Sequence, residues 1–203
     1  RGDLDVALRR ERPAEDYRAA LERMREEVTR MTALAENLLL LARADAGLPA
    51  AAVGAVDLAD VADRAVARAS RQADAARVAL TAVTAATVVR GDAALLERAV
   101  GNLVENAVRY APMGSHVAVR CSVAPGAAVL EVEDDGPGVP PEHAAHIFDR
   151  FYRGDPARGR DSGAGLGLPI ARAIAEAHRG TLVLARTGPR ALFRMTLPLA
   201  PEA

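Results

Sequence analysis

The spacing of the apolar residues between positions 14 and 46 constrains the fold of this chain more than any other feature. These residues alternate spacings of four and three, the heptad pattern of helices that pack against other helices. They are Tyr17, Leu21, Met24, Val28, Met31, Ala35, Leu38 and Ala42. An earlier apolar segment, residues 4–8, ends near Pro13, which suits a helix start. We therefore predict an antiparallel helical hairpin over residues 1–46. It can form a dimeric four-helix bundle or pack inside a larger core.

Composition excludes several classes of chemistry. All 26 basic residues are Arg, so a P-loop and lysine Schiff-base chemistry are excluded. The net charge of -1 argues against broad nucleic-acid binding, and the single Cys121 excludes an internal disulfide and a cysteine-rich zinc site. No apolar run approaches the ~20 residues that span a bilayer. Because the chain opens without Met in what we interpret as mid-helix, we expect a fragment of a longer protein. Any membrane segments would precede Arg1.

The pattern changes after the hairpin. Residues 47–56 are rich in Ala, Gly and Pro, carry no charge and are interpreted as a linker. Asp57 can cap a helix that runs to about Ala75. Later segments predict helices over 94–110 and 166–178, and strands over 78–83, 86–89, 117–122, 129–134, 181–185 and 192–197. We therefore predict an α+β fold for the chain as a whole. The hairpin is followed, over 57–200, by an α/β sandwich with a mixed sheet covered by helices on one face.

Two asparagines mark the first candidate site segment. Asn102 and Asn106 are four residues apart and share a face of the predicted helix, and Arg109 and Tyr110 continue that face. Asn is unfavourable inside helices, so two at this spacing require a reason. Amide oxygens suit Mg²⁺, an Arg suits phosphate, and a Tyr can stack on a base. An ordinary exposed polar face explains this helix equally well.

An acidic strand end forms the second segment. Alternation places Leu130, Val132 and Asp134 on one face, so the Asp134 carboxylate points where core residues point. A carboxylate there requires a donor, and the exocyclic amine of adenine is one candidate. Gly136 and Gly138 allow the backbone to approach a ligand closely. A common turn after an edge strand is the alternative.

A glycine-rich segment and the loop before it complete the set. Gly163, Gly165 and Gly167 precede a helix, and free N–H groups at a helix start bind phosphate. The polar loop over 140–161 contains Phe148 and Phe151, which can anchor a mobile lid. A flexible lead into a helix and an ordinary surface loop are the alternatives.

In this order the segments resemble the catalytic core of sensor histidine kinases of two-component systems. This core has a Bergerat-type ATP-binding fold of the GHKL superfamily, which also includes gyrase, heat-shock chaperones and MutL proteins. The matching segments are the N box (102–112), the first glycine box (134–138), the F box (147–153) and the second glycine box (163–168). The resemblance covers roughly residues 4–198.

The resemblance implies binding of ATP and Mg²⁺. Asn106 would coordinate the metal with Asn102 as a second contributor, Arg109 would contact phosphate, and Tyr110 would pack along the nucleotide. Asp134 would accept a hydrogen bond from the adenine amine. The remaining residues would shape the adenine wall (Gly136, Gly138), anchor the lid (Phe148, Phe151), reach the terminal phosphates (Arg153) and cradle the phosphates (Gly163, Gly165, Gly167, Leu168).

The resemblance also implies an activity for the intact protein. It would be a protein-histidine kinase that phosphorylates its own His and passes the phosphate to an Asp on a response-regulator receiver domain. The intact protein would form a homodimer through the hairpin. This chain would be the cytoplasmic domain of a bacterial membrane sensor. The phosphoacceptor box is missing, because the histidines, His116, His143, His146 and His178, all lie outside the hairpin. We therefore expect the box to lie upstream of Arg1, and the fragment to bind ATP without autophosphorylation.

The chain departs from patterns of the wider group at two places, one bearing on the activity and one on the phosphate contacts. Hydrolysing members carry Glu where this chain has Asn102, and Glu105 is rotated off that face, which favours phosphoryl transfer over hydrolysis. The stretch from Gly188 to Ala191 stands where the family usually has Gly-x-Gly-Thr, so the resemblance does not carry a phosphate contact over to it. The alternatives are a serine kinase or ATPase of the same superfamily, and a nucleotide-binding dimerisation or scaffold module.

Overall fold

The computed structural model describes residues 13–46, 54–154 and 164–201 and divides the chain into two compact units, Arg1–Leu40 and Leu41–Ala203. The first unit is described from residue 13 and is formed by residues 14–40 of helix α2 (Ala14–Asp45). The earlier helix of the predicted hairpin lies outside the described residues. Among the described helices, none is long and apolar enough to cross a bilayer.

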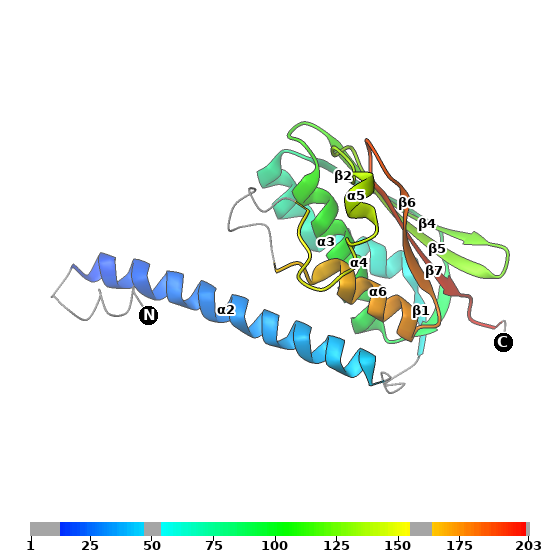
Figure 1. Ribbon diagram of the computed structural model, residues 1–203, viewed down its shortest axis with the longest axis horizontal. Coiled ribbons are helices and arrows are strands. Elements are labelled where there is room, and N and C mark those ends of the chain that lie inside the picture. The colour runs from blue at the N-terminus through cyan, green and yellow to red at the C-terminus, as the bar shows by residue number, and fades with distance from the viewer. Residues whose placement is uncertain (1–12, 47–53, 155–163, 202–203) are drawn as a thin grey trace. The chain divides into compact units, whose positions relative to one another are not determined.

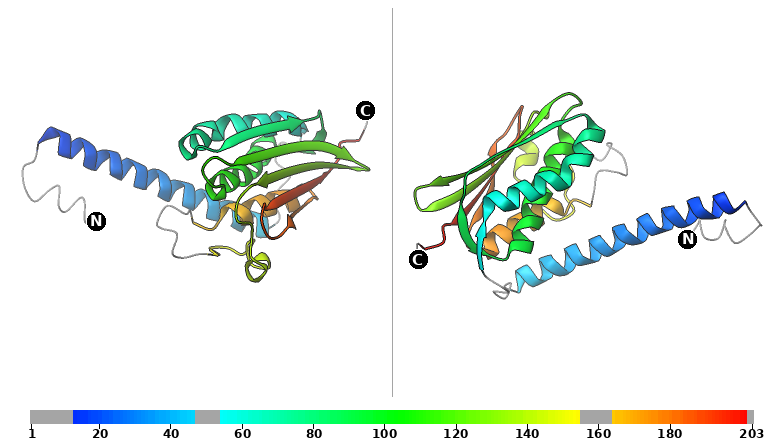
Figure 2. Two further views of the ribbon diagram at one scale, coloured as in Figure 1. Left: turned by 90° about the horizontal axis from the view of Figure 1, so that it is seen from above. Right: turned by 180° about the vertical axis from the view of Figure 1, so that it is seen from behind.

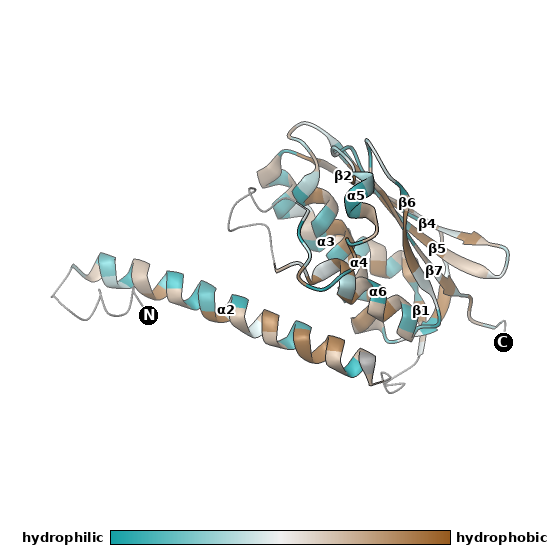
Figure 3. Ribbon diagram, viewed as in Figure 1, coloured by the Kyte–Doolittle hydropathy of each residue, from teal (hydrophilic) through white to brown (hydrophobic). Residues whose placement is uncertain are grey.

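Helix α2 carries the heptad seam on its surface. Acidic Glu15 and Asp16 lie in its first turn and Arg43 in its last, as the helix dipole favours. Teal and brown residues alternate along the helix in Figure 3, with more brown toward its C-terminal end. Several seam residues are exposed on this single chain: Tyr17, Leu21, Val28, Met31 and Leu38.

The second unit is built on a mixed five-stranded sheet in the order β2-β4-β5-β7-β6. Its strands are β2 (Ala79–Thr84), β4 (His116–Ala124), β5 (Ala127–Asp134), β6 (Thr181–Arg186) and β7 (Leu192–Pro198). Only β2 and β4 pair in parallel, and the other neighbours are antiparallel. Helices α3 (Leu58–Ala76), α4 (Ala93–Tyr110) and α6 (Gly167–Ala177) lie side by side on one face (Figures 1 and 2). This arrangement confirms the predicted α/β sandwich.

A second, two-stranded sheet was not expected from the sequence. Strand β1 (Gly54–Asp57) pairs antiparallel with β3 (Val88–Gly91), so residues 54–56 of the expected linker belong to a strand. The four-residue β1 is too short to show alternation, and its partner lies far along the chain. Asp57 caps α3 as predicted, because its Oδ1 accepts from the backbone N–H of Ala59 and also of Thr87, both at 2.9 Å.

The core is made of small and aliphatic side chains. The buried face of α3 is a stripe of alanines that lets α3 approach α4 closely, and the buried face of α4 carries larger residues. The alanines are Ala62, Ala65, Ala69 and Ala73, and the α4 residues are Leu96, Val100, Leu103 and Val104. The sheet adds Val119, Leu130, Val132, Met195 and Leu197. This packing fits a sequence with only 3% aromatic residues.

His178 ties the end of α6 to the start of α4. Its Nε2 accepts from the backbone N–H of Asp92 at 3.0 Å, and its Nδ1 lies 2.7 Å from the carbonyl oxygen of Ile174. A backbone N–H only donates, so Nε2 carries the lone pair and the ring is the neutral Nδ1–H tautomer.

Two glycines should respond oppositely to alanine. Gly101→Ala should raise the free energy of unfolding by about 0.5–1 kcal/mol, because Gly101 lies inside α4 and an added Cβ has no neighbour within 4 Å. Gly180→Ala should lower it by roughly 1–3 kcal/mol, because the Cβ would overlap the Thr196 carbonyl and lie 2.5 Å from Leu197 Cδ2. Urea denaturation of both variants measures this. Equal changes in the free energy of unfolding would contradict the open surroundings of Gly101 and the close packing at Gly180.

Candidate functional site

The polar face of α4 meets the beginning of α6. Asn102 and Asn106 are half-buried, and among the described residues the Asn102 Nδ2 is buried without a hydrogen-bond partner. A Cβ on Gly167, the first residue of α6, would lie 3.8 Å from the Asn102 amide. A buried amide without a partner is costly, so this group is available to a bound molecule.

The start of α6 offers donors beside that amide. Leu166 occupies its N-cap position and provides no side-chain cap, so the first N–H groups of the helix keep no such partner. Gly165 (φ +68°) passes so close to the 151–152 backbone that its Cβ would lie 2.8 Å from the Tyr152 carbonyl oxygen. Leu168 is half-buried. Gly163 lies outside the described residues.

A buried carboxylate lies at the other end of α4. Asp134 ends β5, is only 3% exposed, and accepts from the backbone N–H of Gly136 at 2.8 Å. Burial raises the pKa of Asp134 from its ordinary 3.8 to about 6; the Gly136 hydrogen bond opposes the rise, and the charges of Asp135 and Glu133 add to it. The sequence expectation that Asp134 faces the core side is confirmed.

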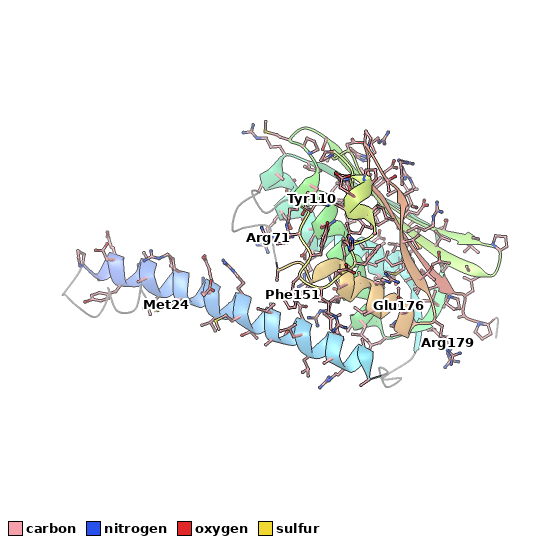
Figure 4. All side chains as sticks on the ribbon, in the orientation of Figure 1. Met24, Arg71, Tyr110, Phe151, Glu176 and Arg179 are labelled. Carbon is pink, nitrogen blue, oxygen red and sulfur yellow. The ribbon has the colours of Figure 1, made fainter. Side chains whose placement is uncertain are left out.

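Gly136 brings this carboxylate against the end of α4. A Cβ there would overlap the Asp134 Oδ1 and lie 3.0 Å from the backbone oxygen of Tyr110. The Tyr110 side chain, labelled in Figure 4, is 40% exposed, and Arg109 is exposed beside it. The Asn102–Arg109 face and Asp134 therefore border one region.

Gly138 serves a different contact from the one expected. Its φ is +77°, and a Cβ would fall on the Gly188 carbonyl, where Val139 and Gly188 form an antiparallel bridge. The close approach that Gly138 permits is to the chain's own backbone.

Phe148 and Phe151, the two residues expected to anchor a lid, differ in how far their rings are packed. The Phe148 ring packs edge-on against Phe193, with ring centroids 6.4 Å apart, and the Arg172 guanidinium lies 5.4 Å from the Phe148 centroid. Phe151 is 57% exposed with φ 63°, and its backbone N–H donates to the Gly165 carbonyl oxygen at 3.0 Å. The Phe151 ring is exposed here, and its role as a second lid anchor stays a prediction. Arg153 is exposed nearby.

Sequence reasoning missed an ion-pair network on the open face of the sheet. Glu133 binds Arg120 at 2.8 Å, Arg186, and Arg190 at 3.5 Å. Hydrogen bonds from Arg120 and Arg186 lower the pKa of Glu133 to about 2. Alternation places Glu133 opposite Asp134, but its partners come from β4, β6 and the segment before β7, so no local signal identifies them.

The geometry selects a ligand with two different ends. The amide and helix start at Asn102 suit an anion, and the carboxylate near Tyr110 suits an N–H donor. The two ends lie eight residues apart along α4, or about 12 Å at the helical rise. This length and polarity suit a nucleotide with several phosphates.

Replacing the buried acid should stabilise the chain at neutral pH. The folded chain binds the Asp134 proton more tightly than the unfolded chain, so ionisation costs stability progressively between about pH 4 and pH 6 and fully above it. Asp134→Asn should therefore raise the free energy of unfolding by up to about 3 kcal/mol at pH 7.5 and by little at pH 4. Denaturation at both pH values measures this.

Glu133→Gln is the matched control, and its expected change in the free energy of unfolding at pH 7.5 has the opposite sign. The lowered pKa of Glu133 means that its charge stabilises the folded chain above about pH 4.5. The variant should therefore be less stable than wild type at pH 7.5. Destabilisation by Asp134→Asn at pH 7.5 would show that burial does not dominate at Asp134.

Comparison with known proteins agrees with this geometry. The family described as "Histidine kinase-, DNA gyrase B-, and HSP90-like ATPase" matches residues 91–201, more than half of the chain. The sensor protein IrlS of Burkholderia pseudomallei (strain K96243) is 40% identical over 180 residues, which are 88% of this chain and 39% of that protein. The sensor histidine kinase CusS of Escherichia coli (strain K12) is 35% identical over 96% of this chain and 41% of its own length. The chain thus spans about two fifths of these relatives.

Solved structures show the same fold. The mycobacterial sensor histidine kinase MprB is 33% identical with a TM-score of 0.63, over 74% of this chain and 99% of that one. Full-length ShkA in complex with AMPPNP is 25% identical with a TM-score of 0.81, over 96% of this chain and 41% of that one. The chain therefore belongs to the histidine kinase-, DNA gyrase B- and HSP90-like ATPases, and within them to the GHKL-type catalytic domains of sensor histidine kinases.

Proposed function

We propose that this chain binds Mg·ATP, with the adenine amine at Asp134 and the phosphates at the start of α6. The observation that carries the proposal is the buried Asn102 Nδ2, which has no partner among the described residues, beside Gly167. The crystallised relative ShkA holds AMPPNP, an ATP analogue, which supports the same ligand class here.

Asn106 and Asn102 would hold the metal. The described residues contain no group of three or more His, Cys, Asp or Glu side chains that could bind a metal ion. A hard cation here would therefore take amide oxygens from the chain and the rest of its ligands from phosphate and water, as Mg²⁺ commonly does. When bound, Mg²⁺ neutralises charge on the phosphates.

The other site residues would act on the nucleotide around this metal. Arg109, one turn beyond Asn106, would contact phosphate, and Tyr110 would pack along the nucleotide. Gly136 would shape the adenine wall. Phe148 would anchor the lid and Arg153 would reach the terminal phosphates. The glycine-box residues would cradle the phosphates: Gly163, Gly165, Gly167 and Leu168.

For the intact protein we propose transfer of the γ-phosphoryl group to a His upstream of Arg1, and from there to a response-regulator Asp. The presence of Asn102 where hydrolysing relatives carry Glu supports transfer over hydrolysis. The chain would supply positioning and charge stabilisation through Arg109, the asparagines and the N–H groups of α6. The protein would be a bacterial membrane sensor with this domain on the cytoplasmic side.

The exposed seam of α2 supports homodimerisation. Leu21, Val28 and Met31 are 64%, 62% and 63% exposed on a single chain. Covering them with a second copy's hairpin would bury apolar surface in a four-helix bundle. We assign residues 1–46 to this hairpin and the rest of the chain from β1 onward to the catalytic domain.

Nucleotide binding should depend on both ends of the site. Wild type should bind ATP with micromolar to millimolar affinity and more tightly with Mg²⁺. Asn106→Ala should remove the Mg²⁺ dependence, and Asp134→Ala should weaken binding at least about tenfold, because a buried acceptor is lost. Titration calorimetry with and without Mg²⁺ measures this. A folded wild-type chain that binds no ATP would exclude the kinase proposal and favour a scaffold module.

Phosphotransfer should require the upstream segment. A protein extended upstream of Arg1 should form an acid-labile, base-stable phosphohistidine from γ-labelled ATP, whereas the 203-residue chain should not. The reason is that the chain's own histidines lie outside α2. Phosphoserine in the extended protein would favour a serine kinase, and phosphate release without labelling would favour an ATPase.

A further inference from the structure

The segment before β7 binds the loop that follows Asp134. The backbone N–H of Asp134 donates to Ala191 at 3.1 Å, that of Arg190 to Gly136 at 3.1 Å, and that of Gly188 to Val139 at 3.3 Å. These bonds continue the β5–β7 pairing beyond its last pair, Glu133 with Leu192. The loop that would face the adenine is therefore fixed by residues 188–191.

The Arg190 side chain fastens the same loop from the open face of the sheet. Its Nε lies 3.0 Å from Asp135 Oδ1 and its Nη2 lies 3.5 Å from Glu133 Oε1. Glu133 and Asp135 flank Asp134 in sequence, so one guanidinium holds both neighbours of the buried acid. Asp135 Oδ2 also accepts from the backbone N–H of His116 at 3.1 Å, which joins the loop to the start of β4.

The backbone of Arg190 adopts a conformation that disfavours side chains. Its φ is 67°, in the left-handed region, where glycine is usual. An arginine that keeps this conformation while its side chain binds two acids indicates a role for the side chain.

We propose that Arg190 is a positioning residue that holds the Asp134–Gly138 loop through Glu133 and Asp135, so that Asp134 selects a base with an exocyclic amine. This inference rests on the proposed ATP site. Arg190 also places positive charge beside the two acids that raise the pKa of Asp134, and so favours the ionised acceptor. Its side chain is 56% exposed, so its ion pairs add little to stability and its effect is chiefly on geometry.

The test compares ATP with inosine triphosphate, whose base carries an oxygen in place of the amine. In Arg190→Gly, the glycine accepts the left-handed backbone and only the side chain is lost. The variant should bind ATP roughly tenfold more weakly, bind inosine triphosphate almost unchanged, and keep its melting temperature within about 4 °C. Calorimetric titration of the 203-residue chain with each nucleotide gives the affinity ratio.

Two further variants separate positioning from general effects. Arg194→Ala removes an ion pair with Glu131, at 2.8 Å, on the same sheet face but away from the loop, and should leave the ratio unchanged. Arg190→Lys keeps a charge for the two acids and should restore part of the ratio. If Arg190→Gly left the ratio of ATP affinity to inosine triphosphate affinity unchanged, this inference alone would be overturned. The same holds if Arg194→Ala lowered that ratio as much as Arg190→Gly does. A wild-type chain that binds no ATP would overturn the proposed function and this inference together.

Discussion

Burial of α4 is the constraint on which the rest of the second unit depends. The helix contacts α3 on one side, α6 on the other and the sheet across its apolar face. That packing leaves one polar strip, with Asn102 near the start of α6 and Tyr110 near Asp134. Because the helix is rigid, the distance between the two ends of this strip is set by its rise per residue. The neutral ring of His178 secures the same relation by joining α6 to the α4 N-terminus.

The site contains two buried polar groups that destabilise the folded chain and that a bound ligand would satisfy. An ionised carboxylate at Asp134 and an amide without a partner at Asn102 both oppose folding in the absence of a bound molecule. Burial of the surrounding alanine, valine and leucine side chains stabilises the fold and offsets these costs. Exchange of stability for binding is expected at a functional site.

Much of the fold and part of the site follow from local patterns. Period-two alternation placed Asp134 on the core side, the four-residue spacing placed Asn102 and Asn106 on one face, and helix caps such as Asp57 were correct. The sequence did not reveal β1, whose partner strand lies more than thirty residues away. It also gave no sign that the Phe151 ring is exposed or that His178 binds the backbone of Asp92, because neither exposure nor a hydrogen-bond partner can be read from spacing.

The face that each polar residue occupies could be read from the sequence, because helix and strand periods are local and fixed. The family could also be read from it, through the resemblance of its motifs. What those residues contact depends on the folded arrangement. Gly138 approaches Gly188, Glu133 joins three arginines, and Arg190 binds both neighbours of Asp134. Except for the contact of Glu133 with Arg120, these contacts join segments fifty or more residues apart. They arise from strand order and register, which no single segment encodes.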